Sequence, residues 1–316
     1  MKILKKAILI TAGLALLAVP ASKVFSQPKD QTTFRSSNTV QLNEEVNAEN
    51  VAKWILQIRK LDAQGSASAP IYLAVYSPGG SIADGMAFNE AIKGTRRPII
   101  TVTMFAASMA FQIVQNAGER QILSTGILMS HRAKGQFEGE FGGQDPSQLD
   151  SRYQLWKDIV TTFDQNTVDR TKGKQTLAGY QKSYVSELWR VGKRAVDEGY
   201  ADKVVTAACD ESLNGTENHS TEFMGMKVNY STSKCPLITG ALNVSLDIST
   251  DKGVMSETDF LAKGGRFDAY CLSSTDSNKI CSLDTSLNVG RLEQVKSNFT
   301  SEYKMKMNKV IYMTFQ

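Results

Sequence analysis

Apolar positions along the first two thirds of the chain fall into two patterns. Short continuous apolar runs rich in β-branched residues predict buried strands, over 71–76, 99–104, 120–124, 127–130 and 203–206. Apolar residues at helical spacing predict helices between them, over 51–65, 82–94, 106–117, 147–167 and 193–198. A short strand is predicted over 39–42. This alternation of buried strands and helices predicts an α/β fold with a mainly parallel sheet.

Turn and cap residues mark several boundaries of these elements. The tetrapeptide Ser-Pro-Gly-Gly over 77–80 follows the first buried run and predicts a tight turn. Ser81 and Asp84 form a predicted N-terminal cap pair for the next helix, which Gly94 ends. Residues 135–143 contain four glycines in a polar setting, which predicts a mobile loop.

The amino-terminal end has the pattern of a leader. Lysines 2, 5 and 6 precede an apolar run over 7–19, and small residues follow, which predicts a signal peptide over 1–26. The apolar run is shorter than the about 20 residues that span a bilayer comfortably, although an uncleaved anchor is the alternative. We therefore expect the protein to be exported, either to the periplasm or out of the cell.

The remaining chain divides into three parts by composition. Residues 27–38 are polar without periodicity and are expected to form a flexible lead-in, and residues 39–208 are expected to form the main domain. Residues 209–316 are rich in Ser, Thr and Asn with scattered apolar positions, which predicts a β-rich extension of unknown role.

All four cysteines, Cys209, Cys235, Cys271 and Cys281, lie in this extension. An even number of cysteines in an exported chain predicts two disulfides, and the paired spacing of a zinc site is absent from the sequence. The connectivity cannot be read from the sequence, and reduced, buried cysteines are the alternative.

Charge and motifs exclude several function classes. The net charge of +4 comes without long basic runs, which disfavours a nucleic-acid surface. A phosphate-binding loop of the G-x-x-x-x-G-K type is excluded, because the glycines over 139–143 are followed by Gln144 and not by lysine. No metal-ligand cluster is visible in the sequence, and we expect neither a cofactor nor a metal.

Candidate chemistry centres on one serine and one histidine. The chain has two histidines, and His219 lies in a polar string that predicts a solvated loop, whereas His131 ends the apolar run 127–130. Ser108 follows the strand 99–104 at the start of a helix, where unpaired N–H groups and the helix dipole favour a developing negative charge. An ordinary capping serine and a structural core histidine are the alternatives for these two residues.

A serine nucleophile needs a base and preorganised donors for the oxyanion. The glycine pair at 79–80 ends a buried strand and allows a backbone N–H to approach a substrate carbonyl without obstruction by a side chain. The amide of Met109, directly after Ser108, is the second candidate donor.

The order of these motifs resembles the proteolytic subunit of the Clp protease. Ser-Pro-Gly-Gly over 77–80, Ala-Ser-Met over 107–109 and Met-Ser-His over 129–131 carry the resemblance, which covers about residues 40–205. The resemblance implies the Clp protease/crotonase-like fold of ββα repeats with a protruding helical handle. It also implies Ser108 as nucleophile, His131 as base, and Gly80 and Met109 as oxyanion-hole donors.

The third member of the catalytic triad is where the sequence departs from the family. Counting back from the family-like segment 199–205, the position of the family's aspartate falls on Glu187. A glutamate can also orient an imidazole. Asp164 and Asp158, expected to be solvated carboxylates on the preceding helix, are the fallback candidates.

The resemblance also implies partners. The segment 147–184 resembles the handle through which stacked rings pair, so a ring-like homo-oligomer is expected. An exported protein would meet neither a cytoplasmic unfoldase nor ATP, so we expect no ATPase partner. The expected function is ATP-independent cleavage of peptides or unfolded proteins by a serine endopeptidase.

Three alternatives remain open at this stage. One is a crotonase-type enzyme, in which Ser108 and His131 would have no role. Another is a serine–lysine protease similar to signal-peptide peptidases, with Lys174, Lys182 or Lys193 as base. The last is a catalytically decayed scaffold that acts as a binding or assembly protein, which the glutamate at position 187 keeps open.

Overall fold

The computed structural model describes residues 30–134, 147–223, 226–250, 253–256, 258–259 and 296–301. The expected leader, the glycine-rich loop over 135–143 and the cysteines Cys271 and Cys281 lie outside these residues. None of the helices in the described ranges is both long and apolar enough to cross a membrane.

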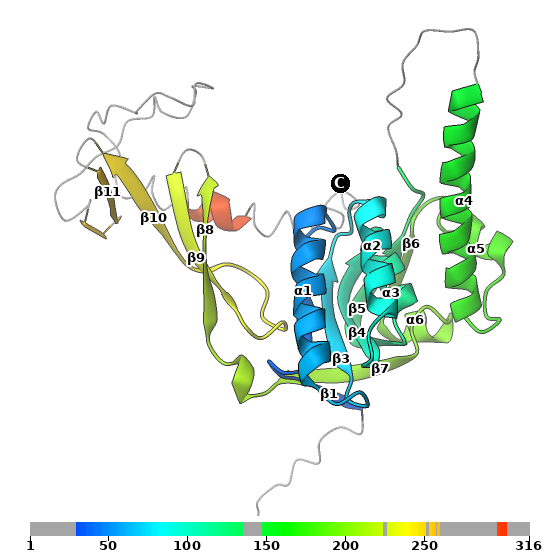
Figure 1. Ribbon diagram of the computed structural model, residues 1–316, viewed down its shortest axis with the longest axis horizontal. Helices are drawn as coiled ribbons and strands as arrows, with labels where there is room; N and C mark the ends of the chain where they lie inside the picture. The colour runs from blue at the N-terminus through cyan, green and yellow to red at the C-terminus, as the bar shows by residue number, and fades with distance from the viewer. Residues whose placement is uncertain are drawn as a thin grey trace, which may run out of the picture.

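A seven-stranded sheet forms the centre of the main domain (Figure 1). Its strands are β1 (Gln31–Phe34), β2 (Thr39–Leu42), β3 (Ile71–Ser77), β4 (Ile99–Ala107), β5 (Glu119–Ser130), β6 (Leu188–Val191) and β7 (Lys203–Cys209). They lie in the order β1-β7-β5-β4-β3-β2, with β6 paired to β5. All neighbours are parallel except β5 and β6, so the expected α/β fold with a mainly parallel sheet is confirmed.

Within the described ranges, six α-helices connect the strands of this sheet. They are α1 (Ala48–Gln64), α2 (Ile82–Lys93), α3 (Met109–Asn116), α4 (Ser147–Arg170), α5 (Leu177–Ser183) and α6 (Gly192–Asp197). The predicted cap of α2 is confirmed, because the Ser81 side chain accepts a hydrogen bond from the Asp84 amide. Gly94 ends that helix, as expected.

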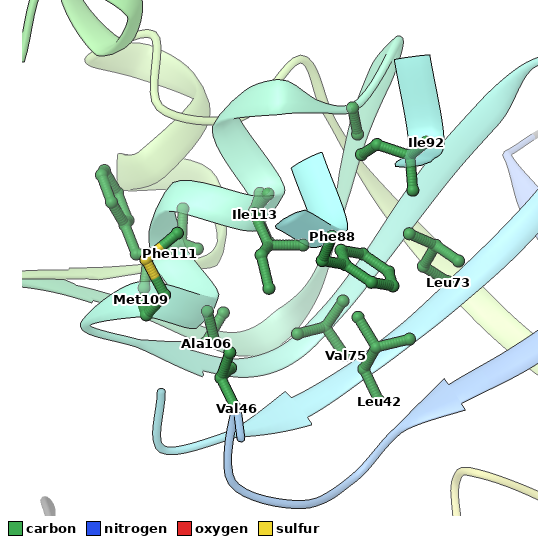
Figure 2. Close-up of a cluster of buried hydrophobic side chains, with 14 of the residues drawn as sticks. Leu42, Val46, Leu73, Val75, Phe88, Ile92, Ala106, Met109, Phe111 and Ile113 are labelled. Atoms are coloured by element: carbon green, nitrogen blue, oxygen red, sulfur yellow. The ribbon is translucent and has the colours of Figure 1, made fainter. Parts of the chain in front are cut away.

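Helices α1, α2 and α3 bury one face of the sheet (Figures 1 and 2). Phe88 of α2 is fully buried, and its ring meets Trp54 of α1 edge to face with centroids 5.8 Å apart. Truncating such an aromatic residue to alanine typically destabilises a domain by about 3–5 kcal/mol. Figure 2 shows Ala106 and Met109 in the same apolar cluster, so the turn that holds Ser108 is fixed by the core on both sides.

The described part of the expected lead-in, residues 30–38, differs from the flexible segment that its polarity predicts. Residues Gln31–Phe34 form β1 and pair in parallel with β7. Alternation explains the difference, because Thr32 and Phe34 point inward and are buried while their neighbours are half-buried. The hydroxyl of Thr32 donates a 2.5 Å hydrogen bond to the Gln121 side chain, which fixes the strand against β5.

The two strands predicted over 120–124 and 127–130 are one strand with an irregularity. The first half of β5 pairs with β7 and the second half with β6. Gly126 lies at the change, where a Cβ would be 2.4 Å from the Thr103 carbonyl oxygen. A glycine is therefore needed for the close approach of β4 and β5.

After β7 the chain forms a short 3-10 helix, Glu211–Leu213, and a second sheet of antiparallel strands. Its strands are β8 (Thr216–Phe223), β9 (Met226–Ser233), β10 (Leu242–Thr250) and β11 (Gly253–Ser256). Figure 1 shows this sheet on the side of the molecule opposite α4.

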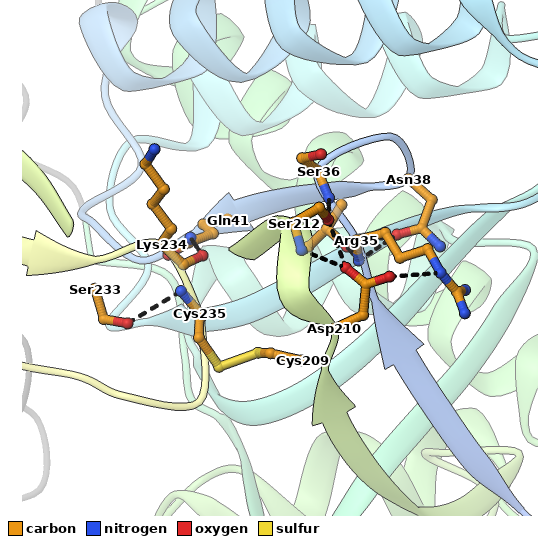
Figure 3. The surroundings of a disulfide bond; sticks show 11 residues. Arg35, Ser36, Asn38, Gln41, Cys209, Asp210, Ser212, Ser233, Lys234 and Cys235 are labelled. Atoms are coloured by element: carbon orange, nitrogen blue, oxygen red, sulfur yellow. Dashed lines mark hydrogen bonds and ion pairs between the residues drawn. A yellow bond between two sulfur atoms is a disulfide. The ribbon is translucent and has the colours of Figure 1, made fainter. Parts of the chain in front are cut away.

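A disulfide between Cys209 and Cys235 ties the second sheet to the main domain (Figure 3). Cys235 packs with Phe34 and Val205 on the face of the main sheet opposite the helices. The Gln41 side chain donates a hydrogen bond to the Lys234 carbonyl at 2.6 Å. Residues 233–237 therefore cover part of that sheet face, a contact that the sequence did not indicate.

Candidate active site

Ser108 occupies the sharp turn between β4 and α3. Its backbone has φ 55° and ψ −121°, a conformation that a residue with a side chain rarely adopts and that costs about 1–3 kcal/mol. The Ser108 amide donates to the Met129 carbonyl at 2.9 Å, which holds the turn against β5. Although Ser108 is at the N-cap position of α3, its hydroxyl makes no capping hydrogen bond. The side chain is therefore not used in the way an ordinary capping serine would be.

His131 follows β5 directly and lines the same cavity as Ser108, Gly80 and Met109. The cavity has a volume of about 170 Å³. Burial lowers the pKa of His131 below its usual value, the Lys134 charge acts in the same direction, and a hydrogen bond with the Arg132 backbone and the Glu187 charge oppose it. A half-buried imidazole with a lowered pKa is neutral at physiological pH and can accept a proton.

Among the described residues, no hydrogen bond joins the Ser108 hydroxyl to the His131 ring. In substrate-free sites such catalytic hydrogen bonds are often long and shorten when the substrate binds. Ser108 and His131 line the same cavity, so both side chains border the space that a substrate would enter.

The glycine pair packs directly against the serine turn. A Cβ on Gly79 would lie 2.7 Å from both the Met109 nitrogen and the Ser108 Cβ. Val46 pairs with the segment on its other side, because its amide donates to the Gly79 carbonyl at 2.8 Å and its carbonyl accepts from Ser81 at 2.8 Å. In a trans peptide the N–H points opposite to the preceding carbonyl, so the Gly80 N–H points away from Val46.

Gly80 and Met109 both line the cavity, which makes their N–H groups the candidate donors at this site. Met109 is the first residue of α3, where the amide has no partner within the helix. Two such donors beside a serine can stabilise negative charge on a carbonyl oxygen under attack.

Glu187 lies next to His131 although it does not line the cavity. Ser130 pairs with Leu188 at the end of the antiparallel β5–β6 ladder, and His131 and Glu187 are the residues next to that pair on each segment. The Glu187 carboxylate accepts a hydrogen bond from the Trp189 indole at 3.1 Å and raises the pKa of His131 electrostatically. A negative charge near an imidazole favours the protonated ring.

The two fallback carboxylates lie in different environments. Asp158 is exposed, as expected, but Asp164 is only 3% exposed, so its expected solvation is wrong. Asp164 lies one helical turn after Val160 and next to Phe163, on the face of α4 that lines the cavity. Those apolar neighbours were the sequence signal that could have identified it.

The lysines considered as alternative bases lie away from the cavity. Lys174, Lys182 and Lys193 are exposed and do not line it, whereas Lys134 does. Lys174 donates to the Val196 carbonyl at 2.8 Å, and Lys193 pairs with Asp197. Of the candidate bases, His131 lines the cavity, whereas Lys174, Lys182 and Lys193 do not.

His219 differs from the solvated loop residue that its polar neighbours predict. It is half-buried on β8, stacks on Tyr230 and hydrogen-bonds to the Thr232 hydroxyl at 2.8 Å. Both contacts join β8 to β9, so His219 has a structural role in the second sheet. In the described ranges, no three or more His, Cys, Asp or Glu side chains converge as they would in a metal site.

Comparison with known proteins points to one family. The family model described as Clp protease matches residues 27–208. The ATP-dependent Clp protease proteolytic subunit 2 of Prochlorococcus marinus is 35% identical over 171 residues, which are 52% of this chain and 79% of that protein. The corresponding subunit 2 of Cutibacterium acnes is 27% identical over 170 residues, 53% of this chain and 76% of that protein. The ATP-dependent Clp protease proteolytic subunit 1 of Leifsonia xyli is 27% identical over 185 residues, which are 58% of this chain and 90% of that protein.

Proposed function

Because the chain belongs to the Clp protease family, we propose that it is a serine endopeptidase with Ser108 as nucleophile and His131 as general base. Membership of this family supports a peptidase. The observation that carries the finer proposal is the serine turn, which holds a strained, uncapped Ser108 in one cavity with His131 and two backbone donors.

The proposed reaction begins with attack of the Ser108 hydroxyl oxygen on the carbonyl carbon of a peptide bond. His131 accepts the hydroxyl proton, and the Gly80 and Met109 amides stabilise the oxyanion of the tetrahedral intermediate. The imidazolium then donates its proton to the leaving amine, which leaves an acyl-enzyme that water hydrolyses in a second round. Glu187 orients His131 and stabilises its cation, while the Trp189 indole holds the carboxylate.

Substrates in this proposal are peptides and unfolded proteins. A cavity of about 170 Å³ is comparable with the ~150 Å³ cavity that holds benzene in an engineered protein, so it accepts one side chain and not a folded surface. The leader predicted over 1–26 supports export, where ATP is absent, so cleavage without ATP or an ATPase partner is part of the proposal. Peptide cleavage in nucleotide-free buffer, together with fractionation of cells that express the tagged chain, tests both points.

A ring-like homo-oligomer whose rings pair through the α4 handle is also proposed. Tyr153 and Leu155, on the first half of α4, are 66% and 57% exposed and offer apolar surface to a second copy of the chain. Native mass spectrometry of the wild type and of Leu155→Ser tests this assignment. A shift of the variant to smaller species is expected, and unchanged assembly would contradict a role of this surface.

Labelling with a fluorophosphonate probe tests the catalytic assignment. The wild type is expected to be labelled at Ser108, Ser108→Ala not at all, and His131→Ala slower by orders of magnitude. Glu187→Gln is expected to lose part of the rate. Ser130→Ala is a matched control, since its hydroxyl contacts Tyr180 at 2.8 Å and has no proposed role in the reaction. No labelling of folded, assembled wild type would support the decayed scaffold instead.

A further inference from the structure

The cavity beside Ser108 combines apolar walls with one buried carboxylate. Ile82, Met109, Val160 and Phe163 contribute apolar surface, and Asp164 lies among them. Such a cavity next to a nucleophile receives the substrate side chain adjacent to the bond that is cut. Its lining therefore decides which side chains the site accepts.

Asp164 is held in place by neutral donors. The Tyr184 hydroxyl donates to Oδ2 at 2.6 Å, and the Gln181 amide donates to the same oxygen at 3.0 Å. In the described part of the chain, the second oxygen, Oδ1, takes part in no hydrogen bond. A carboxylate oxygen accepts up to two hydrogen bonds, so Oδ1 keeps its capacity to bind a ligand in the cavity.

No lysine or arginine within the described ranges forms an ion pair with Asp164. Lys134 lines the cavity but is exposed, and Arg132, also exposed, acts electrostatically on Tyr184. Buried carboxylates are normally paired with a cation, because desolvation of an unpaired charge is strongly unfavourable. Burial raises the pKa of Asp164, and the hydrogen bonds from Tyr184 and Gln181 oppose this shift. A cationic side chain in the cavity would stabilise the ionised form of this carboxylate, which is 3% exposed.

We propose that Asp164 makes this site select peptides with a lysine or arginine side chain immediately before the bond that Ser108 attacks. The inference rests on the proposed peptidase function and specifies its substrate class. The aliphatic stem of the basic side chain lies against Val160 and Phe163, and its charged end reaches Oδ1 of Asp164. Lysine and arginine fit this combination because their long apolar stems carry the charge at the tip.

The contacts of Asp164 differ from those expected of a third triad member. Glu187 acts on the pKa of His131, whereas Asp164 is not among the groups that shift it. The carboxylate of Asp164 is instead engaged with α5 and the residue that follows it, through Gln181 and Tyr184. These contacts favour a role of Asp164 in substrate specificity over a role in orienting the base.

The experiment compares fluorogenic peptides that differ only in the residue before the scissile bond. Lysine and norleucine form the decisive pair, because norleucine has the aliphatic stem without the ammonium group. The wild type is expected to favour the lysine peptide about tenfold or more in kcat/KM, and Asp164→Asn is expected to remove most of this ratio. Asp158→Asn removes the same charge from an exposed position on the same helix and is expected to keep the ratio.

Labelling by the fluorophosphonate probe, which lacks a basic side chain, separates selectivity from chemistry. The labelling rate of Asp164→Asn is expected to fall by much less than its kcat/KM for the lysine peptide. Equal cleavage of lysine and norleucine peptides by the wild type would overturn the inference. So would a variant that loses labelling in proportion to cleavage of the lysine peptide, since Asp164 would then act on Ser108 or His131.

A binding measurement keeps the inference testable if the peptidase proposal fails. If the wild type is neither labelled nor able to cleave any peptide, the same two peptides are titrated against Ser108→Ala by fluorescence anisotropy. Tighter binding of the lysine peptide, lost when Asp164→Asn is added, would support the inference without the activity. Equal binding of both peptides would overturn it.

Discussion

Gly79 lies against Ser108 so closely that a Cβ added to the glycine would be 2.7 Å from the Cβ of the serine. It would also be 2.4 Å from the Ala107 carbonyl oxygen, which belongs to a buried strand and cannot move away. The φ of Gly79, 88°, adds strain for any other residue. The glycine turn and the serine turn therefore form one packed unit that sets the positions of both proposed oxyanion donors.

Replacing Gly79 with alanine is expected to destabilise the protein and to slow probe labelling of Ser108. Backbone strain and overpacking together predict a loss of about 2–4 kcal/mol in the free energy of unfolding. Urea denaturation and labelling rates measure the two effects. Gly173→Ala is a matched control, since Gly173 has a φ of 83° but nothing within 4 Å of its added Cβ. Equal destabilisation by both changes would show that strain alone, and not close packing, is responsible.

The pH dependence of the reaction should follow the charges around His131. A general base must be neutral, so the rate falls as the pH decreases through the His131 pKa, which burial holds below its usual value. Glu187 raises this pKa and Lys134 lowers it. Glu187→Gln should therefore shift the acid limb to lower pH, and Lys134→Gln should shift it to higher pH.

Labelling rates measured across the acid range at low ionic strength test these directions, since salt screens the exposed Lys134. Arg59→Gln serves as the control, because Arg59 is an exposed residue of α1 that is not among the groups acting on His131. If Glu187→Gln left the acid limb unchanged, its proposed contact with the imidazolium would be wrong.

The sequence motifs point to residues that line one cavity because each motif marks the end of a strand. In a parallel sheet the carboxyl ends of neighbouring strands meet at one edge, so residues that follow β3, β4 and β5 converge without any need to know loop lengths. Gly80, Ser108 and His131 are of this kind, and the cavity contains all three. The fold class followed from the same alternation of strands and helices.

The environments of residues that depend on long-range packing were harder to predict from the sequence. The burial of Asp164 depends on how α4 packs against α3 and α5, which a polar helix sequence does not specify. The burial of Phe34 depends on β1 reaching β7, which lies far along the chain. The orientation of Glu187 depends on the antiparallel register of β6, because the resemblance gave its position and not its contacts.

Removal of the Cys209–Cys235 disulfide is expected to destabilise the attachment of the second sheet. The two cysteines are 26 residues apart, and the chain-entropy model predicts a loss of about 3–4 kcal/mol when a loop of this length is opened. The double variant Cys209→Ser/Cys235→Ser, and not reduction, is the appropriate change, because it leaves Cys271 and Cys281 untouched. Thermal unfolding and limited proteolysis after residue 209 measure the effect, and peptide mapping verifies the bond.

Proteolysis provides the internal comparison for this prediction. Segment 233–237 should become susceptible to cleavage in the double variant, while α1, packed on the opposite face of the sheet, should stay protected. Equal protection in the wild type and the variant would mean that the apolar contacts of Cys235 and Leu237 hold the segment without the covalent bond.

Replacing Asp202 with asparagine should destabilise the main domain through Arg120. The Arg120 side chain is 1% exposed, and its guanidinium donates to both Asp202 oxygens, at 3.2 Å from Nε and 2.9 Å from Nη2. Without the carboxylate a guanidinium charge stays buried and uncompensated, which predicts a loss of about 3–5 kcal/mol in the free energy of unfolding. Asp197→Asn, which breaks the exposed pair with Lys193, should change stability by about 1 kcal/mol or less.

The acid stability of the protein tests the same pair in a second way. Burial alone would raise the pKa of Asp202, but hydrogen bonds and the charge of Arg120 outweigh burial and hold this pKa below its usual value. Asp202 therefore stabilises the fold above its unfolded-state pKa of about 4, and this contribution is lost as the pH falls through the lower folded-state value. Denaturation curves at neutral and acidic pH should show that the wild type loses more stability on acidification than Asp202→Asn. Parallel losses would mean that other carboxylates control acid unfolding and that the Arg120–Asp202 pair contributes little.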